Sequence, residues 1–87
     1  MKSYVYILRD RGGRFYVGST TDIDRRLKQH SSGQTQTTRN MKEPALVLLQ
    51  EYPSRPAAWR AERKIKNFKR RDFIEKMVRD GYVRVKL

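Results

Sequence analysis

Arg26 and His30 stand four residues apart in the stretch GSTTDIDRRLKQH, which begins at Gly18. Side chains at this spacing are neighbours on one face of a helix. The arginine offers a planar clamp for two phosphate oxygens, and the histidine can take a proton from water. The pair therefore suits chemistry on a phosphate ester, provided that the chain forms a helix here.

Glu62 is the third residue whose position has chemical consequences. It falls on the core-facing arc of a later helical pattern, beside Ala58, Ala61 and Ile65. A carboxylate on such an arc costs free energy unless a positive group pairs with it. We therefore expect Glu62 to have a cationic partner.

Two tyrosines, Tyr6 and Tyr16, belong to the segments that would form a sheet. Ser3–Leu8 and Phe15–Ser19 are rich in β-branched and aromatic residues, which predicts strands, and the intervening DRGGR predicts a turn. The two strands would then form a hairpin. Ser3–Leu8 shows little polar alternation, so we expect both of its faces to be buried and the strand to be central.

The register of this hairpin decides whether Tyr6 and Tyr16 can build one site. Side chains alternate along a strand, so the tyrosines share a face only if paired residue numbers have an even sum. A two-residue turn made of the two glycines would pair Arg11 with Arg14 and place the tyrosines on opposite faces. We therefore predict an odd-length loop, most simply Arg11–Gly13 with its last glycine at positive φ.

The next elements follow from capping and strand signals. Thr21 is the expected N-cap of the first helix, with Asp24 three residues later in a capping-box-like arrangement. Ser31–Pro44 is polar and predicts a loop, whereas Ala45–Tyr52 predicts the third strand.

Two further helices are expected after the third strand. One begins near Ser54, and a break near Lys69–Asp72 separates it from the other, which ends before Gly81. Tyr82–Leu87 fits either a short strand or a frayed end. The order β-β-α-β-α-α predicts an α+β fold in one domain over residues 1–87. The buried faces of these two helices should carry Ala58, Ala61, Ile65 and Phe68, then Phe73, Ile74, Met77 and Val78.

Charge points to a polyanionic partner. The 87 residues include 21 Lys and Arg but 9 Asp and Glu, for a net charge of +12. Nucleic acid is the first candidate partner and an anionic membrane surface the second. The basic residues are spread among aromatic ones, which a disordered basic tail would lack.

Composition excludes several other classes. The chain has no cysteine and one histidine, which leaves no disulfide, thiolate zinc site or multi-histidine site. Its longest early apolar run is too short for a signal peptide, and no stretch approaches a membrane span. A cytoplasmic monomer is the default expectation, without membrane association.

The chain resembles the GIY-YIG nuclease family in an ordered set of motifs. These are YVY at Tyr4–Tyr6, YVG at Tyr16–Gly18, the stretch Gly18–His30 and the helix with Glu62. The likeness covers nearly the whole chain and is strongest to small standalone bacterial members. It implies a small three-stranded antiparallel sheet flanked by helices. It also implies hydrolysis of phosphodiester bonds with a divalent metal.

The resemblance carries the family's functional residues over one at a time. Tyr6 matches the tyrosine of the first motif and Tyr16 that of the second. Arg26 matches the helix arginine, and His30 stands four residues on, where the family has histidine or tyrosine. Glu62 matches the metal-binding glutamate, so Mg²⁺ or Mn²⁺ is the implied cofactor.

Two family features have no match. The first motif is Tyr-Val-Tyr and lacks its glycine, and Asn67 lies too close to Glu62 to be the family's later asparagine. A single carboxylate is nevertheless compatible with a magnesium site. Magnesium keeps several bound waters and takes further ligands from the substrate phosphate. The ion would act as a Lewis acid while Arg26 clamps the phosphate. His30, or a tyrosine near the cations, would take the proton from water.

Each residue also has a structural explanation. Tyr6 and Tyr16 are ordinary strand residues by propensity, and His30 could be a favourable cation near a helix C-terminus. Glu62 could pair with Arg26 without any metal. Taken jointly, in the family's order, the five residues favour the functional interpretation.

Three functions are compatible with these residues and this charge. The first is a metal-dependent nuclease acting on DNA, and the second is a nucleic-acid-binding module that kept the scaffold and lost turnover. The third, a lipid-surface binder, is weak because no helix has a basic amphipathic pattern. Glu62 favours the enzyme, since a carboxylate does not help a purely phosphate-binding surface. The candidate nucleic-acid contacts are Arg39, Lys64, Lys66, Lys69, Arg70 and Arg71.

Overall fold

The computed structural model describes residues 2–31, 44–68 and 70–83. Its elements are β1 (Ser3–Arg9), β2 (Phe15–Thr20), α1 (Ile23–Ser31), β3 (Ala45–Tyr52), α2 (Arg55–Phe68) and α3 (Arg71–Asp80). The predicted order and the α+β class are therefore confirmed. No helix within these ranges is long and apolar enough to cross a membrane.

Some predictions concern residues outside the described ranges. These are the two candidate phosphate contacts Arg39 and Lys69, nearly all of the loop between Ser31 and Pro44, and the last four residues of the Tyr82–Leu87 segment.

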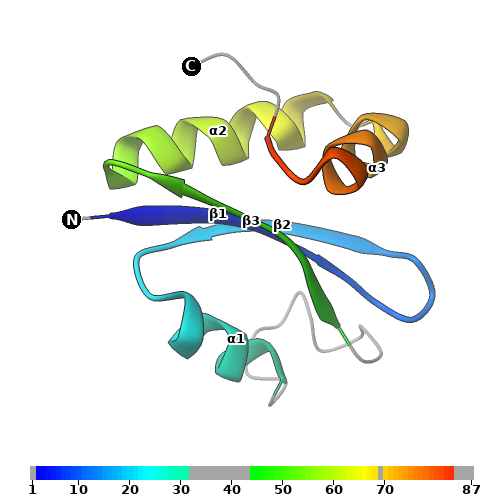
Figure 1. Cartoon of the computed structure of the whole chain (residues 1–87), viewed down its shortest axis with the longest axis horizontal. Helices are drawn as coiled ribbons and strands as arrows, with labels where there is room; N and C mark the ends of the chain where they lie inside the picture. Colours follow the sequence, from blue (N-terminus) through cyan, green and yellow to red (C-terminus); the bar gives the residue numbers. More distant parts are fainter. Residues whose placement is uncertain (1, 32–43, 69, 84–87) are drawn as a thin grey trace.

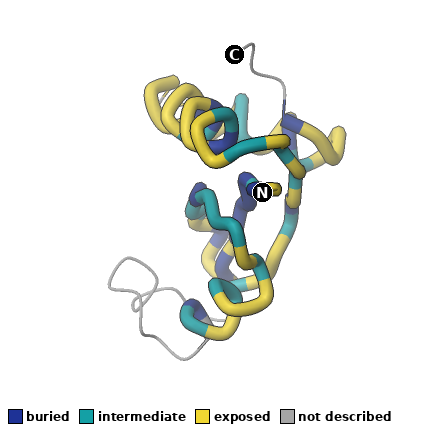
Figure 2. Tube along the Cα trace, turned by 90° about the vertical axis from the view of Figure 1, so that its left-hand side faces the viewer, coloured by how far each residue is buried: buried dark blue, intermediate teal, exposed yellow. Residues whose placement is uncertain are grey.

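The three strands form one antiparallel sheet in the order β2-β1-β3, so β1 is central, as its apolar sequence predicted. The sheet separates α1 on one face from α2 and α3 on the other (Figure 1). The main core lies on the α2 and α3 side, where Val5, Ile7 and Val17 pack with Ile65 and Met77. Figure 2 shows these buried segments along the strands and on the sheet-facing side of α2.

The β1–β2 hairpin has the predicted three-residue loop. Tyr6 pairs with Gly18, an even sum, so Tyr6 and Tyr16 share the face opposite the main core. The Asp10 N–H donates to the Arg14 carbonyl over 2.9 Å, and the residues between them form the loop. Its last residue, Gly13, has φ of 88°, which a residue with a side chain rarely adopts.

The helix starts show one prediction that was wrong and one that was right. Asp22, not Thr21, caps α1, because its Oδ1 accepts the Arg25 N–H at 3.1 Å. The Thr20 hydroxyl accepts the Asp22 N–H, which sets the cap at Asp22. Ser54 caps α2 as expected, by accepting the Ala57 N–H at 3.3 Å.

The predicted break between the last two helices is present, but Phe68 does not belong to the buried face. Phe68 is 47% exposed at the last residue of α2. It packs on Phe73 of α3, with ring centroids 4.6 Å apart, because the chain turns here. Gly81 ends α3 at φ 83°, with its N–H bonded to the Met77 carbonyl, as predicted.

Candidate active site

Tyr6, Tyr16 and His30 form an aromatic cluster between the sheet and α1. The Tyr6 hydroxyl lies 2.8 Å from His30 Nε2, within hydrogen-bonding distance. The Tyr16 ring centroid is 6.1 Å from that of Tyr6 and 5.0 Å from that of His30. Tyr6 is 1% exposed and His30 is 3% exposed, whereas Tyr16 is only partly buried. Of the three, Tyr16 is therefore the side chain that solvent or substrate can reach.

Gly18 makes room for this cluster. It lies directly opposite Tyr6 in the ladder, and the Tyr6 ring extends across it. A Cβ at Gly18 would stand 2.5 Å from the Tyr6 hydroxyl oxygen and 2.6 Å from Cζ. The glycine of the YVG motif is therefore needed to let Tyr6 reach His30.

Gly18→Ala should destabilise the fold by about 1–3 kcal/mol, because the ring must leave its place or the strands must separate. Urea unfolding measures this change. Gly12→Ala is the matched control, since a Cβ there meets Asp10 Oδ1 at an ordinary 3.6 Å. Equal stability of the two variants would show that the close packing of Tyr6 on Gly18 is not required.

Arg26 acts electrostatically on the buried cluster. Burial lowers the pKa of His30 below its ordinary value, and the nearby positive charge of Arg26 lowers it further. His30 is therefore a neutral imidazole at neutral pH. Burial also raises the pKa of Tyr6, with Tyr16 adding to the increase and Arg26 opposing it. Tyr6 accordingly remains a neutral phenol hydrogen-bonded to His30.

Glu62 faces the same region from α2. Its side chain is 15% exposed and forms an ion pair with Lys66, one turn later, at 3.6 Å. The expected cationic partner is thus Lys66, and no Glu62–Arg26 ion pair occurs among the described residues. Lys66 Nζ also lies 5.9 Å from the Tyr16 ring centroid, and the charge of Glu62 contributes to the raised pKa of Tyr6.

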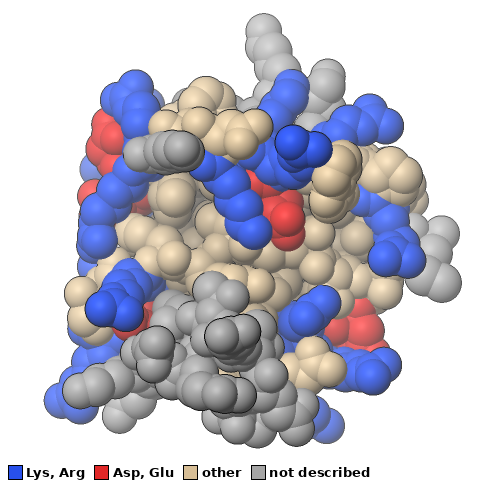
Figure 3. All heavy atoms as spheres, turned by 180° about the vertical axis from the view of Figure 1, so that it is seen from behind, with Lys and Arg blue, Asp and Glu red and all other residues tan. Residues whose placement is uncertain are grey.

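The structure therefore brings the five predicted site residues into one region. Tyr6 and Tyr16 come from the first two strands, Arg26 and His30 from α1, and Glu62 from α2. The space-filling view from behind shows Lys and Arg side chains around a central area of mostly uncharged ones (Figure 3). Across the described ranges, no group of three or more acidic or histidine side chains could enclose a metal ion.

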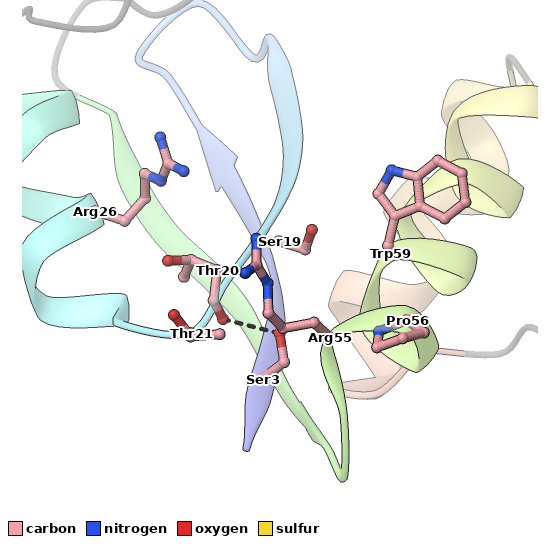
Figure 4. Close-up of a pocket in the computed structure, with 8 residues that line it drawn as sticks. All are labelled: Ser3, Ser19, Thr20, Thr21, Arg26, Arg55, Pro56 and Trp59. Atoms are coloured by element: carbon pink, nitrogen blue, oxygen red, sulfur yellow. Dashed lines mark hydrogen bonds between the residues drawn. The ribbon is translucent and has the colours of Figure 1, made fainter. Parts of the chain in front are cut away.

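A pocket of about 440 Å³ opens beside Arg26, between the start of α1 and the start of α2. Ser19, Arg55 and Trp59 also line it (Figure 4). A second hollow, lined by Arg26, Arg25 and the residues before α1, lies next to it. Arg26 is thus accessible from two hollows and also acts on the buried cluster.

Arg55 and Trp59 were not among the site residues predicted from the sequence. Their signal was the stretch RPAAWR, in which the tryptophan lies off the buried stripe set by Ala58, Ala61 and Ile65. No spacing rule placed this side chain opposite Arg26, because the two helices lie on different faces of the sheet.

The predicted phosphate contacts on α2 and α3 differ in their availability. Arg70 pairs with Asp72 at 2.7 Å and Arg71 with Glu75 at 3.0 Å. Lys66 is engaged with Glu62, as described above, and Lys64 is exposed. By contrast, the guanidinium groups of Arg26 and Arg55 have no carboxylate partner among the described residues.

The sheet sets two tyrosines beside a helical arginine and a glutamate, in the order that the sequence predicted. The GIY-YIG catalytic domain matches residues 2–77, and the chain therefore belongs to the GIY-YIG family.

Several relatives have similar lengths and sequences. The UPF0213 protein BH0048 of Halalkalibacterium halodurans is 43% identical over 72 residues, which are 82% of this chain and 77% of that protein. The UPF0213 protein YhbQ of Escherichia coli K12 is 34% identical over 79 residues, 90% of this chain and 78% of YhbQ.

One solved structure is also similar. The solution NMR structure of the UPF0213 protein BH0048 from Bacillus halodurans has a TM-score of 0.60 and 39% sequence identity, covering 93% of this chain and 87% of that one. The fold is therefore shared with a relative whose structure was determined by experiment.

Proposed function

We propose that this protein is a metal-dependent endonuclease that hydrolyses phosphodiester bonds in DNA, with the whole chain acting as one domain. The observation that carries the proposal is the geometry around the Tyr6–Tyr16–His30 cluster. Arg26 lies one turn before His30 on α1. Glu62 pairs with Lys66, whose ammonium lies 5.9 Å from the Tyr16 ring centroid. Arg26 supplies a guanidinium without a carboxylate partner among the described residues. A surface that only bound phosphates would not benefit from the carboxylate of Glu62.

Glu62 is the residue that would hold Mg²⁺ or Mn²⁺. A single carboxylate fits magnesium, which keeps several waters and shares substrate phosphate oxygens. Lys66 neutralises Glu62 in the absence of a metal ion. When a metal ion binds Glu62 instead, the half-exposed Lys66 side chain can turn toward a phosphate. When bound, the ion would supply Lewis-acid stabilisation of the charge that develops on the phosphate.

The remaining residues would bind the phosphate and manage the proton. Arg26 would clamp two non-bridging oxygens of the scissile phosphate. Tyr16 is the most accessible phenol of the cluster, so it would contact the attacking water. The proton would pass from water to Tyr16 and through Tyr6 to Nε2 of His30, because Tyr6 lies within hydrogen-bonding distance of His30 and beside the Tyr16 ring. His30 would thus accept the proton without touching the water.

The second candidate is a nucleic-acid-binding module without turnover. The observation that favours it is the absence of a match to the family's later asparagine and to the glycine of its first motif. The net charge of +12 supports both candidates equally.

Incubation with branched, nicked, single-stranded and duplex DNA tests the proposal. We expect cleavage of at least one substrate with Mg²⁺ or Mn²⁺ and none with excess EDTA. Failure to cleave any of these substrates with either ion would reject the nuclease and leave the binding module.

DNA binding should weaken steeply with salt. For about six phosphate contacts, log K against log salt should fall with a slope of about −5 on duplex DNA. Fluorescence anisotropy in EDTA measures this slope without cleavage. A slope near zero would mean that the basic residues do not contact the DNA backbone.

A further inference from the structure

Trp59 is the most exposed of the large apolar side chains in the described part of the chain. It is 50% exposed, although it stands on α2 beside the fully buried Ala58. It is also the one tryptophan of the whole sequence. A tryptophan contributes little to the core from this position, so the exposed half of its surface is available to a ligand.

Arg63 lies over the Trp59 ring. Its guanidinium carbon lies 4.8 Å from the ring centroid, one helical turn further along α2. A guanidinium over an indole is attracted by the electrons of the ring. Such a contact would favour one position of the indole, which lowers the entropic cost of stacking another planar group on it.

The pocket beside Trp59 has the chemistry of a nucleotide site. Arg26 and Trp59 lie on opposite sides, with Arg55 and Ser19 between them (Figure 4). The hydroxyls of Ser19 and Thr21 have no hydrogen-bond partner among the described residues, so both can bond to the edge of a base. The pocket volume of about 440 Å³ lies within the range typical of small-molecule sites.

We propose that this pocket binds an unpaired nucleobase, stacked on Trp59, from the strand whose phosphate contacts Arg26. The inference rests on the proposed function and adds a substrate class to it. Bases inside a duplex already stack on their neighbours and cannot cover the indole without leaving the helix. The substrate is therefore DNA with a single-stranded segment next to the cleaved bond, such as a free strand, a gap or a flap.

Two alternative occupants fit less well. A lipid chain would need an apolar pocket, whereas this one carries two guanidinium groups and several hydroxyls. A bare phosphate would need Arg26 and Arg55 but would not use the aromatic ring. The indole together with the cations selects a ligand that is both aromatic and anionic.

Intrinsic fluorescence tests the stacking directly, because Trp59 is the sole tryptophan. The wild-type protein is titrated in EDTA with a thymidine 12-mer, with a 12-mer of abasic sites and with a 12-base-pair duplex. We expect strong quenching by the thymidine strand and weak quenching by the other two. The abasic strand keeps the phosphate charge, so it separates stacking from electrostatic attraction.

Substitutions give the second measurement, by anisotropy of labelled strands. Trp59→Ala should weaken binding of the thymidine strand by roughly 5- to 150-fold. Its affinity for the abasic strand should equal that of the wild type. Trp59→Phe should retain most of the affinity. Tyr82→Ala is the control, since Tyr82 is similarly exposed and does not line the pocket.

The outcomes separate this inference from the proposed function. Equal affinity of the wild type for the thymidine and abasic strands, or no effect of Trp59→Ala, would overturn the stacking site even if the protein cleaves DNA. Quenching and discrimination without any cleavage would support the stacking site and reject the nuclease. Absence of binding to every strand would reject both.

Discussion

Replacement of Glu62 by glutamine should reduce DNA cleavage to background and leave DNA binding unchanged or tighter. Glutamine keeps the volume and hydrogen-bonding groups of the side chain but removes the charge that would fix the cation. Loss of a Lewis acid costs several kcal/mol of transition-state stabilisation, which corresponds to roughly 1,000-fold or more in rate. Binding should survive because a negative charge has left a surface that faces phosphates.

Glu75→Gln is the matched control for this prediction. Glu75 is exposed on α3 and pairs with Arg71 at 3.0 Å, so the substitution removes the same charge from a pair that contributes little to stability. Its cleavage rate should equal that of the wild type. If Glu62→Gln and Glu75→Gln cleave equally fast, the metal assignment to Glu62 is wrong.

Arg26→Ala should lose both cleavage and some affinity, unlike Glu62→Gln. Removing one group that stabilises transition-state charge typically lowers the rate by about 100- to 1,000-fold. One phosphate contact also disappears, so the salt slope should become shallower by about 0.9. Arg26→Lys should recover affinity better than rate, because an ammonium keeps the charge but not the planar clamp.

Lys28→Ala supplies the control for charge alone. Lys28 is exposed on α1, two residues from Arg26, and lines neither of the two hollows beside it. Its removal should leave the cleavage rate unaffected. Equal rates for wild type and Arg26→Ala at saturating DNA would contradict the role of Arg26 at the scissile phosphate.

Sequence patterns predicted the parts of the fold that follow from strand alternation, apolar runs and helix capping. The hairpin register followed from requiring Tyr6 and Tyr16 to share a face, which demanded an odd-length loop with Gly13 at positive φ. The central position of β1 followed from its continuous apolar sequence. Ser54 and Gly81 marked helix ends because their capping chemistry is local.

Other features were not predicted from the sequence. Phe68 fits the apolar stripe of α2, yet it contacts Phe73 because the helix ends there. Arg70 remains a predicted phosphate contact, but its ion pair with Asp72 was not anticipated. The N-cap moved from Thr21 to Asp22 because neighbouring polar side chains compete for the same amides.

Sequence reasoning could choose candidate site residues, but it could not place each of them within the site. Spacing placed Arg26 and His30 on one helix face, and only the fold shows that His30 is buried with Tyr6 on its Nε2. Within the proposed mechanism, this burial favours Tyr16 over His30 as the group that meets the attacking water. Trp59 became a candidate only because the fold places it across a pocket from Arg26.

The most direct test of the nuclease assignment is the cleavage rate as a function of Mg²⁺ concentration. Wild-type protein and Glu62→Gln, purified side by side, are compared on the best substrate among those tested. We expect a saturable rise for the wild type, no activity in EDTA, and no activity of Glu62→Gln at any Mg²⁺ concentration. Cleavage by the wild type in EDTA, or the same Mg²⁺ curve for both proteins, would contradict a metal-dependent site built on Glu62.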